Sequence, residues 1–359
     1  MSRFHNLKIK ALKKETPECV SVLFDVPEDK KEIFGFKHGQ YLTLKTIIDG
    51  EEVRRSYSIC SSPLDEQLTV AIKTIPEGKF SNYAYSTLKV GDEVEVMPPL
   101  GRFSTDLLET NKKNYFFIAV GSGITPVMSI VKTILKTEPQ STIILLYGNK
   151  NKGSIIFKEQ FEALKNKYMR RLSLYYILSQ EKADAEILAG RIDKTKIEYF
   201  LKNIIDPVMI DECFLCGPED LILTAKDTLA AAGIPTKNIH FELFTTAGAQ
   251  LAKKQIKKVT KISTGPRSKV IIKLDGVSTE MEIPYEGESI LDAAMKSGSD
   301  LPYACKGGVC CACKAKLEKG EVTMDVNYGL EQDEIDAGFI LTCQAHPKTK
   351  DVVINFDVK

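Results

Sequence analysis

The first part of the chain consists of short apolar stretches separated by turn residues. The turns are marked by Gly39, Asp49-Gly50, Gly78 and Gly91-Asp92. Short strands at this spacing, each bounded by turn signals, predict a small antiparallel β-barrel over residues 1–108. The expected strands are residues 19–25, 41–47, 56–60, 68–75 and 93–97.

From residue 112 onward, apolar strands alternate with amphipathic helices. Strand 115–120 is followed by Gly121-Ser122-Gly123-Ile124-Thr125-Pro126 and by a helix with its apolar residues on one face. This alternation predicts an open parallel sheet with helices on both faces over residues 112–244. The further elements expected are the strand–helix pairs 142–147 with 157–167, 173–178 with 194–203 and 212–216 with 219–232, and a last strand 239–244.

The remainder divides into a polar stretch and a compact end. Residues 245–268 lack apolar periodicity and carry five lysines between 253 and 261, so we expect a solvated linker rather than a nucleic-acid site. Residues 269–359 predict a compact α+β domain. Its elements are a hairpin turning at Asp275-Gly276, a short helix over 289–296, and strands over 314–317 and 352–356.

Composition excludes several classes of protein. With 359 residues, the chain is long enough for two or three domains. Its net charge of +1 provides no general attraction to nucleic acid or to a membrane surface, and its apolar runs are too short to span a bilayer. The N-terminus shows no secretory signal, and nine cysteines, an odd number, suit a reducing compartment. We therefore expect a cytoplasmic protein.

Four cysteines near the C-terminus carry the most specific chemistry in the sequence. Cys305, Cys310 and Cys313 have the spacing C-x4-C-x2-C, and Cys343 follows after a long interval. This is the plant-type ligand spacing of a [2Fe–2S] cluster. The glycines at 307 and 308 allow the loop to turn tightly around the sulfurs.

Zinc and disulfides are the alternatives for these cysteines. Zinc sites usually present paired C-x2-C knuckles, whereas this loop contains one such pair plus an additional cysteine. Disulfides fit poorly in a large chain without a signal peptide. Cys311 lies between the ligands, and we interpret it as a non-ligand.

Two short motifs in the barrel region could bind an anion or an aromatic ring. Arg55-Ser56-Tyr57-Ser58 lies on a predicted strand, and by itself it is more typical of a barrel strand with an exposed Arg and a packed Tyr than of a binding site. Gly78-Lys79-Phe80-Ser81 opens a short helix expected over residues 81–88. The N–H groups at such a helix start can bind a pyrophosphate, although an N-capping Ser after a turn is an equal alternative.

Two loops at the carboxyl ends of predicted strands are candidates for nucleotide binding. Gly121 and Gly123 lie where a strand meets a helix, and Cys216-Gly217-Pro218 occupies the same position after a later strand. The first loop is not a G-x-G-x-x-G fingerprint, which disfavours an ordinary NAD-type Rossmann site. Cys213 and Cys216 are three apart on a strand and point to opposite faces, so we do not expect them to pair.

In their order and separations, these motifs resemble those of the ferredoxin–NADP reductase superfamily. With a plant-type ferredoxin domain appended, the chain resembles the reductase components of oxygenases. This family includes the reductase component of phenylacetyl-CoA epoxidase, an enzyme of phenylacetate catabolism. The resemblance implies an FAD-binding barrel over 1–108, an NAD(P)-binding α/β domain over 112–244, and a β-grasp ferredoxin domain over 269–359.

The resemblance also implies roles for individual residues. In this family the Arg of R-x-Y-S binds the flavin pyrophosphate, the Tyr packs on the isoalloxazine and the Ser contacts its N5 edge. The turn from Gly78 to Ser81 matches the pyrophosphate turn, which favours FAD over FMN. The implied flavin-binding residues are Arg55, Ser56, Tyr57, Ser58, Gly78, Lys79, Phe80 and Ser81.

On the nucleotide side, the resemblance places Thr125 near the flavin–nicotinamide contact and Cys216 facing the nicotinamide. Glu242 matches a family Glu near the flavin, and a surface carboxylate at a strand end is the alternative. Ser58, Cys216 and Glu242 are thus the expected catalytic residues. The nucleotide-binding set is Gly121, Gly123, Thr125, Pro126, Cys216, Gly217 and Pro218.

The implied reaction takes electrons from NADPH, or alternatively NADH, through FAD and the cluster to a partner oxygenase. Lys150, Lys152 and Ser179 could contact a 2′-phosphate, but Gln180 stands where many relatives carry Arg. Other acceptors in the same class are an aromatic-ring hydroxylase, an acyl desaturase and a hybrid-cluster protein. From other classes, a redox carrier or sensor without turnover and a zinc-stabilised interaction module remain open.

Overall fold

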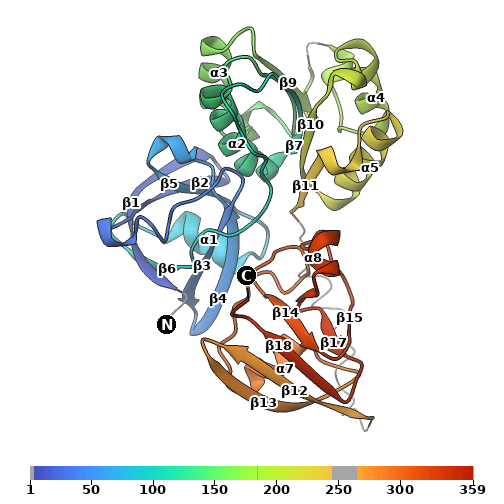
Figure 1. Ribbon diagram of the computed structural model, residues 1–359. Coiled ribbons are helices and arrows are strands. Elements are labelled where there is room, and N and C mark those ends of the chain that lie inside the picture. Colours follow the sequence, from blue (N-terminus) through green and yellow to red (C-terminus); the bar gives the residue numbers. More distant parts are fainter. Residues whose placement is uncertain (1–3, 184, 245–264, 359) are drawn as a thin grey trace. The chain divides into compact units, whose positions relative to one another are not determined.

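A computed structural model of the chain describes residues 4–183, 185–244 and 265–358 (Figure 1). These residues divide into two units, one made largely of residues 4–244 and the other of the C-terminal part. The expected linker falls mostly on residues 245–264, which lie outside the described residues. No helix in the described ranges is long and apolar enough to cross a membrane.

The first sheet has six strands in the order β4-β3-β6-β1-β2-β5. A bridge between Ile59 and Val70 joins the end of β4 to β5 and closes the sheet into the predicted barrel. Strand β1 was not predicted, because its apolar alternation ends after Ile9, where the pairing with β2 is irregular. The elements are β1 (His5–Thr16), β2 (Cys19–Asp25), β3 (Tyr41–Ile48), β4 (Glu51–Ser58), β5 (Leu68–Lys73), β6 (Glu93–Val96) and α1 (Lys79–Ser86).

The second sheet has five strands in the order β11-β10-β7-β8-β9, and the neighbouring strands are parallel. Helices α2 and α3 cover one face and α4 and α5 the other, as predicted (Figure 1). The strand order reverses at β7, which is where open parallel sheets bind ligands. The elements are β7 (Asn114–Val120), α2 (Ile124–Thr137), β8 (Thr142–Asn149), α3 (Lys158–Lys167), β9 (Leu172–Leu178), α4 (Lys194–Asn203), β10 (Glu212–Gly217), α5 (Glu219–Ala231) and β11 (Ile239–Leu243).

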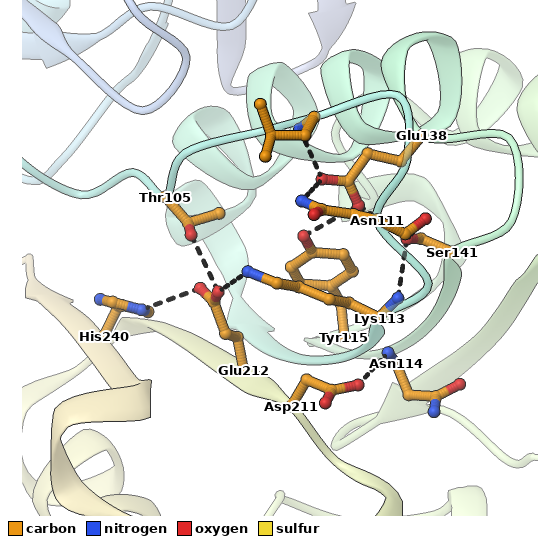
Figure 2. A network of polar contacts seen from close by, with 11 residues as sticks. Thr105, Asn111, Lys113, Asn114, Tyr115, Glu138, Ser141, Asp211, Glu212 and His240 are labelled. Carbon is orange, nitrogen blue, oxygen red and sulfur yellow. Dashed lines mark hydrogen bonds and ion pairs between the residues drawn. The ribbon is translucent and has the colours of Figure 1, made fainter.

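Two buried carboxylates anchor the segment that joins these two sheets (Figure 2). Glu138, at the end of α2, accepts hydrogen bonds from Asn111 at 2.6 Å and from the hydroxyl of Tyr115 at 3.0 Å. Glu212, at the start of β10, accepts one from Thr105 at 2.9 Å and pairs with Lys113. The connecting segment is therefore held at the amino ends of the parallel strands, opposite the edge that carries the glycine loops.

The C-terminal sheet is mixed, with the order β13-β12-β18-β14-β16. Asp275 and Gly276 form the predicted hairpin turn, with φ of 51° and 75°. Strand β12 begins at Arg267, inside the range expected to be linker. Strands β15, β16 and β17 and helix α8 were not predicted, because each has five residues or fewer. The elements are β12 (Arg267–Leu274), β13 (Val277–Pro284), α7 (Ile290–Lys296), β14 (Lys314–Lys319), β15 (Val322–Met324), α8 (Gln332–Asp336), β16 (Phe339–Leu341), β17 (Ala345–Pro347) and β18 (Asp351–Asn355).

Candidate functional site

A cavity of about 550 Å³ lies between the barrel and the carboxyl edge of the parallel sheet. The sheet contributes Gly121 after β7, Gly217 at the end of β10 and Pro218 after it. These are residues that the sequence predicted to bind a nucleotide. The barrel side and the neighbouring loops contribute Glu18, Lys73, Thr74, Ile75, Pro76, Asn82, Lys150 and Phe244.

The loop between β7 and α2 approaches β10 so closely that it requires glycine. Gly121 has φ of +56°, and a Cβ on Gly123 would lie 2.2 Å from the carbonyl oxygen of Cys216. Thr125 is buried in the first turn of α2 and donates a 3.0 Å hydrogen bond to the carbonyl of Ser122. The loop therefore presents backbone at the helix start, which suits the phosphates of a dinucleotide.

Three residues predicted to be catalytic come together at this edge. Glu242 on β11 is the register partner of Cys216 on β10. Burial raises the pKa of Glu242 to about 8, and a hydrogen bond from Ser58 of the barrel opposes the shift. The Oε2 atom of Glu242 is buried and has no hydrogen-bond partner among the described residues. A buried acceptor of this kind is expected where a further polar group binds.

The two barrel motifs also meet. The rings of Tyr57 on β4 and Phe80 on α1 lie 5.5 Å apart. Gly78 is the N-cap of α1, and a Cβ there would lie 2.4 Å from Ile75 and from the hydroxyl of Ser81. Helix α1 thus begins at Lys79 rather than at Ser81, and Ser81 is not its N-cap. A glycine N-cap supplies no side chain to the first N–H groups, which leaves them suited to a pyrophosphate.

The remaining predicted flavin residues lie on the same two elements. Arg55 on β4 is exposed, and its guanidinium donates a 2.7 Å hydrogen bond to the carbonyl of Arg54. Ser56 is half-buried beside it. Lys79 forms an ion pair with Glu51 at the start of β4.

A polar seam fixes α2 against the barrel. The hydroxyl of Ser129 donates a 2.6 Å hydrogen bond to the carbonyl of Ser61, and the hydroxyls of Ser62 and Thr133 lie 2.9 Å apart. Asp65 accepts hydrogen bonds from Lys132 and Lys136 of the same helix. Because α2 begins at the glycine loop and the Ser61 segment follows Ser58, the seam sets the position of the loop relative to the flavin motif.

The loops after β8 and β9 lie together, as a site for the far end of a nucleotide requires. The backbone N–H of Gln180 donates to the carbonyl of Lys150 at 2.8 Å. The backbone N–H and the hydroxyl of Ser179 both donate to the carbonyl of Asn149. Lys150 lines the cavity, whereas Lys152 forms an ion pair with Glu181 at 3.6 Å. Of the two lysines expected near a 2′-phosphate, Lys150 is thus the one that faces the cavity.

Sequence reasoning missed Lys73 at the end of β5. It lines the cavity, lies 3.7 Å from Glu18, and its Nζ lies 4.0 Å from the position of a Cβ on Gly121. The signal available in the sequence was its position five residues before Gly78, at the end of an apolar strand.

The four predicted ligand cysteines come together in the C-terminal unit. The thiol of Cys310 donates to that of Cys305 at 3.1 Å. Hydrogen bonds with Cys310 and Cys343 hold the pKa of Cys305 well below its usual range, and those with Cys305 and Cys313 raise the pKa of Cys343. The thiol of Cys311 instead donates to the carbonyl of Gly329 at 2.6 Å.

The loop geometry and the donor set fit a two-iron cluster. The N–H of Gly307 donates to the sulfur of Cys305 at 3.3 Å, and Gly308 has φ of +72°, where a Cβ would lie 2.8 Å from the carbonyl oxygen of Val326. Within the described residues, no three Cys, His, Asp or Glu side chains are arranged to hold one metal ion. A [2Fe–2S] cluster divides its four thiolates between two irons, so it does not need three at one point.

Three family matches cover most of the chain. Residues 6–105 match the oxidoreductase FAD-binding domain, residues 117–227 the oxidoreductase NAD-binding domain, and residues 272–348 the 2Fe-2S iron-sulfur cluster binding domain. The three folded regions thus correspond to FAD, NAD(P) and [2Fe–2S] domains, as the resemblance implied.

Relatives match over the full length. A component of the 1,2-phenylacetyl-CoA epoxidase of Escherichia coli K12 is 44% identical over 359 residues, covering 100% of this chain and 99% of that protein. The ferredoxin reductase component of 3-ketosteroid-9-alpha-monooxygenase from Rhodococcus rhodochrous is 32% identical, covering 99% and 97%. The structure of phthalate dioxygenase reductase shares the fold, with a TM-score of 0.58 and 23% identity over 98% of both chains. The chain therefore belongs to the family of oxygenase reductase components that transfer electrons from NAD(P)H through FAD and a [2Fe–2S] cluster.

Proposed function

We propose that this chain supplies electrons from NADPH to an oxygenase that epoxidises phenylacetyl-CoA. The full-length 44% identity to the Escherichia coli epoxidase component supports this choice of acceptor. The redox site rests on one observation, the meeting of Ser58 from the barrel with Cys216 and Glu242 from the parallel sheet. Gly217, which follows Cys216, lines the cavity. A flavin ring held by the barrel and a nicotinamide held by the sheet would meet there.

The flavin residues proposed are those of the two barrel motifs. FAD, when bound, accepts two electrons together and releases them singly. Arg55 and the first N–H groups of α1 would hold its pyrophosphate, and Tyr57 would pack on its ring. Ser58 and Glu242 would lie at its reacting edge. Because its pKa is raised to about 8, Glu242 holds a proton at neutral pH next to the Ser58 hydroxyl.

On the nucleotide side, the N–H groups around Gly121 and Gly123 would bind the phosphates. Thr125 would form part of the wall of the nicotinamide pocket. Cys216 is fully buried, and burial, followed by the nearby Glu242, raises its pKa well above the usual range. A neutral, buried thiol excludes water from the face on which the nicotinamide would lie. Lys150 and Lys73 would meet the phosphates of NADPH.

The proposed cluster ligands are Cys305, Cys310, Cys313 and Cys343. We assign residues 1–108 to flavin binding, 112–244 to nucleotide binding and 269–359 to the cluster, with 245–268 as the linker. The odd number of cysteines favours the cytoplasm as the location.

The proposal is tested by reconstitution. We expect NADPH-dependent cytochrome c reduction by the purified chain, faster than with NADH, and coupled consumption of NADPH and phenylacetyl-CoA when the epoxidase oxygenase component is added. Turnover with cytochrome c but none with the epoxidase would favour a ring hydroxylase, an acyl desaturase or a hybrid-cluster protein as acceptor. No catalytic rate with any acceptor would favour a carrier or sensor.

A further inference from the structure

Gln344 follows the proposed ligand Cys343, and only 3% of its surface is exposed. Its side-chain Nε2 lies 3.1 Å from the carbonyl oxygen of Lys306, 3.0 Å from that of Cys343 and 3.7 Å from the sulfur of Cys343. All three are acceptors, so the NH₂ group of the amide, rather than its oxygen, faces them.

The backbone directs this side chain toward the cysteine loop. The backbone N–H of Gln344 donates to the carbonyl of Leu341 at 2.9 Å. The backbone carbonyl of Gln344 accepts from the backbone N–H of Asp325 at 3.0 Å. On the loop side, a Cβ on Gly308 would lie 3.1 Å from Cγ of Gln344. The glutamine therefore packs against the loop that carries Cys305 and Cys310.

The carbonyl that Gln344 holds belongs to a residue with an unusual backbone. Lys306 directly follows Cys305 and has φ of 51°, a left-handed conformation that disfavours residues other than Gly, Asn and Asp. The Gln344 amide thus connects two parts of the ligand set that lie 38 residues apart. It bonds to the loop at Lys306 and to the fourth ligand at Cys343.

We propose that Gln344 positions the cluster loop and raises the reduction potential of the cluster by donating a hydrogen bond to the Cys343 sulfur. A cluster that has accepted an electron carries additional negative charge on its sulfurs. A donor aimed at a sulfur stabilises that charge, and hydrogen bonds to the sulfurs are among the factors that set the potential of an iron–sulfur cluster. This inference rests on the proposed function, because it requires Cys343 to be a ligand.

The test compares Gln344→Leu with Thr342→Val in the full-length protein. Leucine fills a volume similar to that of glutamine but has no N–H group to donate. Thr342 flanks Cys343 on its other side, and its hydroxyl donates to the carbonyl of Cys313 at 2.9 Å rather than to a sulfur. Both variants remove one buried hydrogen-bonding side chain next to the same ligand.

Reduction potentials are measured by EPR-monitored redox titration. We expect a more negative potential in Gln344→Leu and a wild-type potential in Thr342→Val. A loaded Gln344→Leu protein with the wild-type potential would overturn the inference, as would an equal shift in both variants.

If Gln344→Leu does not retain the cluster, Gln344→Met is measured in its place. Methionine is unbranched and close to glutamine in length but has no N–H to donate, so the potential should again become more negative. An unchanged potential would refute the inference. Failure of the proposed function would give a different result from failure of this inference. The wild-type protein would not contain two irons per chain, or Cys343→Ala would retain its cluster spectrum.

Discussion

Glu242 on β11 and Cys216 on β10 are register partners, so their side chains leave the parallel sheet on the same face. The two residues belong to motifs 26 positions apart, and the hydroxyl of Ser58 reaches the carboxyl group from the barrel. The backbone of the glycine loop closes on the same point, since Gly123 abuts the carbonyl of Cys216.

The buried carboxyl of Glu242 should make stability depend on pH. Its pKa in the folded protein is about 8, above the usual value of 4.5, so the folded state binds this proton more tightly than the unfolded chain. Its contribution to the free energy of unfolding is therefore full below pH 4.5 and declines as the pH rises toward 8. Glu242→Gln should flatten this decline in urea unfolding curves collected across that range. An unchanged slope would contradict the assigned environment.

Lys73 should contribute to binding of the dinucleotide phosphates. In Lys73→Gln we expect KM for NADPH to rise about tenfold, roughly 1.4 kcal/mol, because one charge-assisted contact is lost. Flavin content should remain that of the wild type. Lys10→Gln, at a lysine whose side chain is 63% exposed on β1, serves as the matched control and should leave KM unchanged. Equal KM values in the two variants would exclude Lys73 from the site.

Gly123→Ala should damage the site through steric conflict with the backbone of β10. The added Cβ would lie 2.2 Å from a carbonyl oxygen that cannot move without shifting a central strand. We expect a loss of about 1–3 kcal/mol in stability and a large loss of NADPH-dependent cytochrome c reduction. Gly153→Ala is the control, since its Cβ would meet its nearest neighbour at 3.5 Å. Near-wild-type kinetics in Gly123→Ala would show that the loop does not make this approach.

Glu212 should stabilise the connection between the barrel and the parallel sheet, and this stabilisation should be lost at acidic pH. Burial alone would raise its pKa, but hydrogen bonds from His240, Lys113 and Thr105 lower it to about 2. The folded pKa lies below the usual 4.5, so the stabilisation is present above pH 4.5 and is lost as the pH falls toward 2.

Glu212→Gln should therefore lower the free energy of unfolding at pH 7 by about 1–3 kcal/mol and make acid unfolding less steep. Circular dichroism during urea titration measures both effects. Asp211→Asn, at the exposed neighbour that accepts from the N–H of Asn114 at 2.7 Å, should have a smaller effect. A cost in Asp211→Asn equal to that in Glu212→Gln would refute the assignment.

Cys343→Ala should abolish the visible absorption of the cluster and still allow NADPH to reduce the flavin, because the proposed flavin motifs lie in the barrel and not in the cluster loop. Cys311→Ala is the matched control, since the thiol of Cys311 donates to the carbonyl of Gly329. We expect the control to retain two irons and normal cytochrome c reduction. Persistence of the cluster spectrum in Cys343→Ala, or its loss in Cys311→Ala, would mean that the ligand set is different.

Local patterns in the sequence determined much of the architecture. Strand β2 and helix α4 have the predicted bounds, because alternating apolar residues and an N-capping Asp193 specify them locally. The family match to the cluster domain agrees with the spacing of four cysteines, since a short loop can surround a cluster only with its ligands at certain separations.

Other features depend on contacts between distant residues. Strand β1 is polar over its second half and is defined by its pairing with β2 and β6. Neither Lys73 nor Gln344 belongs to a sequence motif. The roles proposed for them depend on where the barrel and the cluster loop place them. Ser58 and Glu242 are 184 positions apart, and only the packing of the parallel sheet against the barrel brings one to the other. The sequence by itself determined which chemistry this protein carries, and the tertiary structure decided which atoms meet, because burial and hydrogen bonding between distant segments exist only in the folded chain.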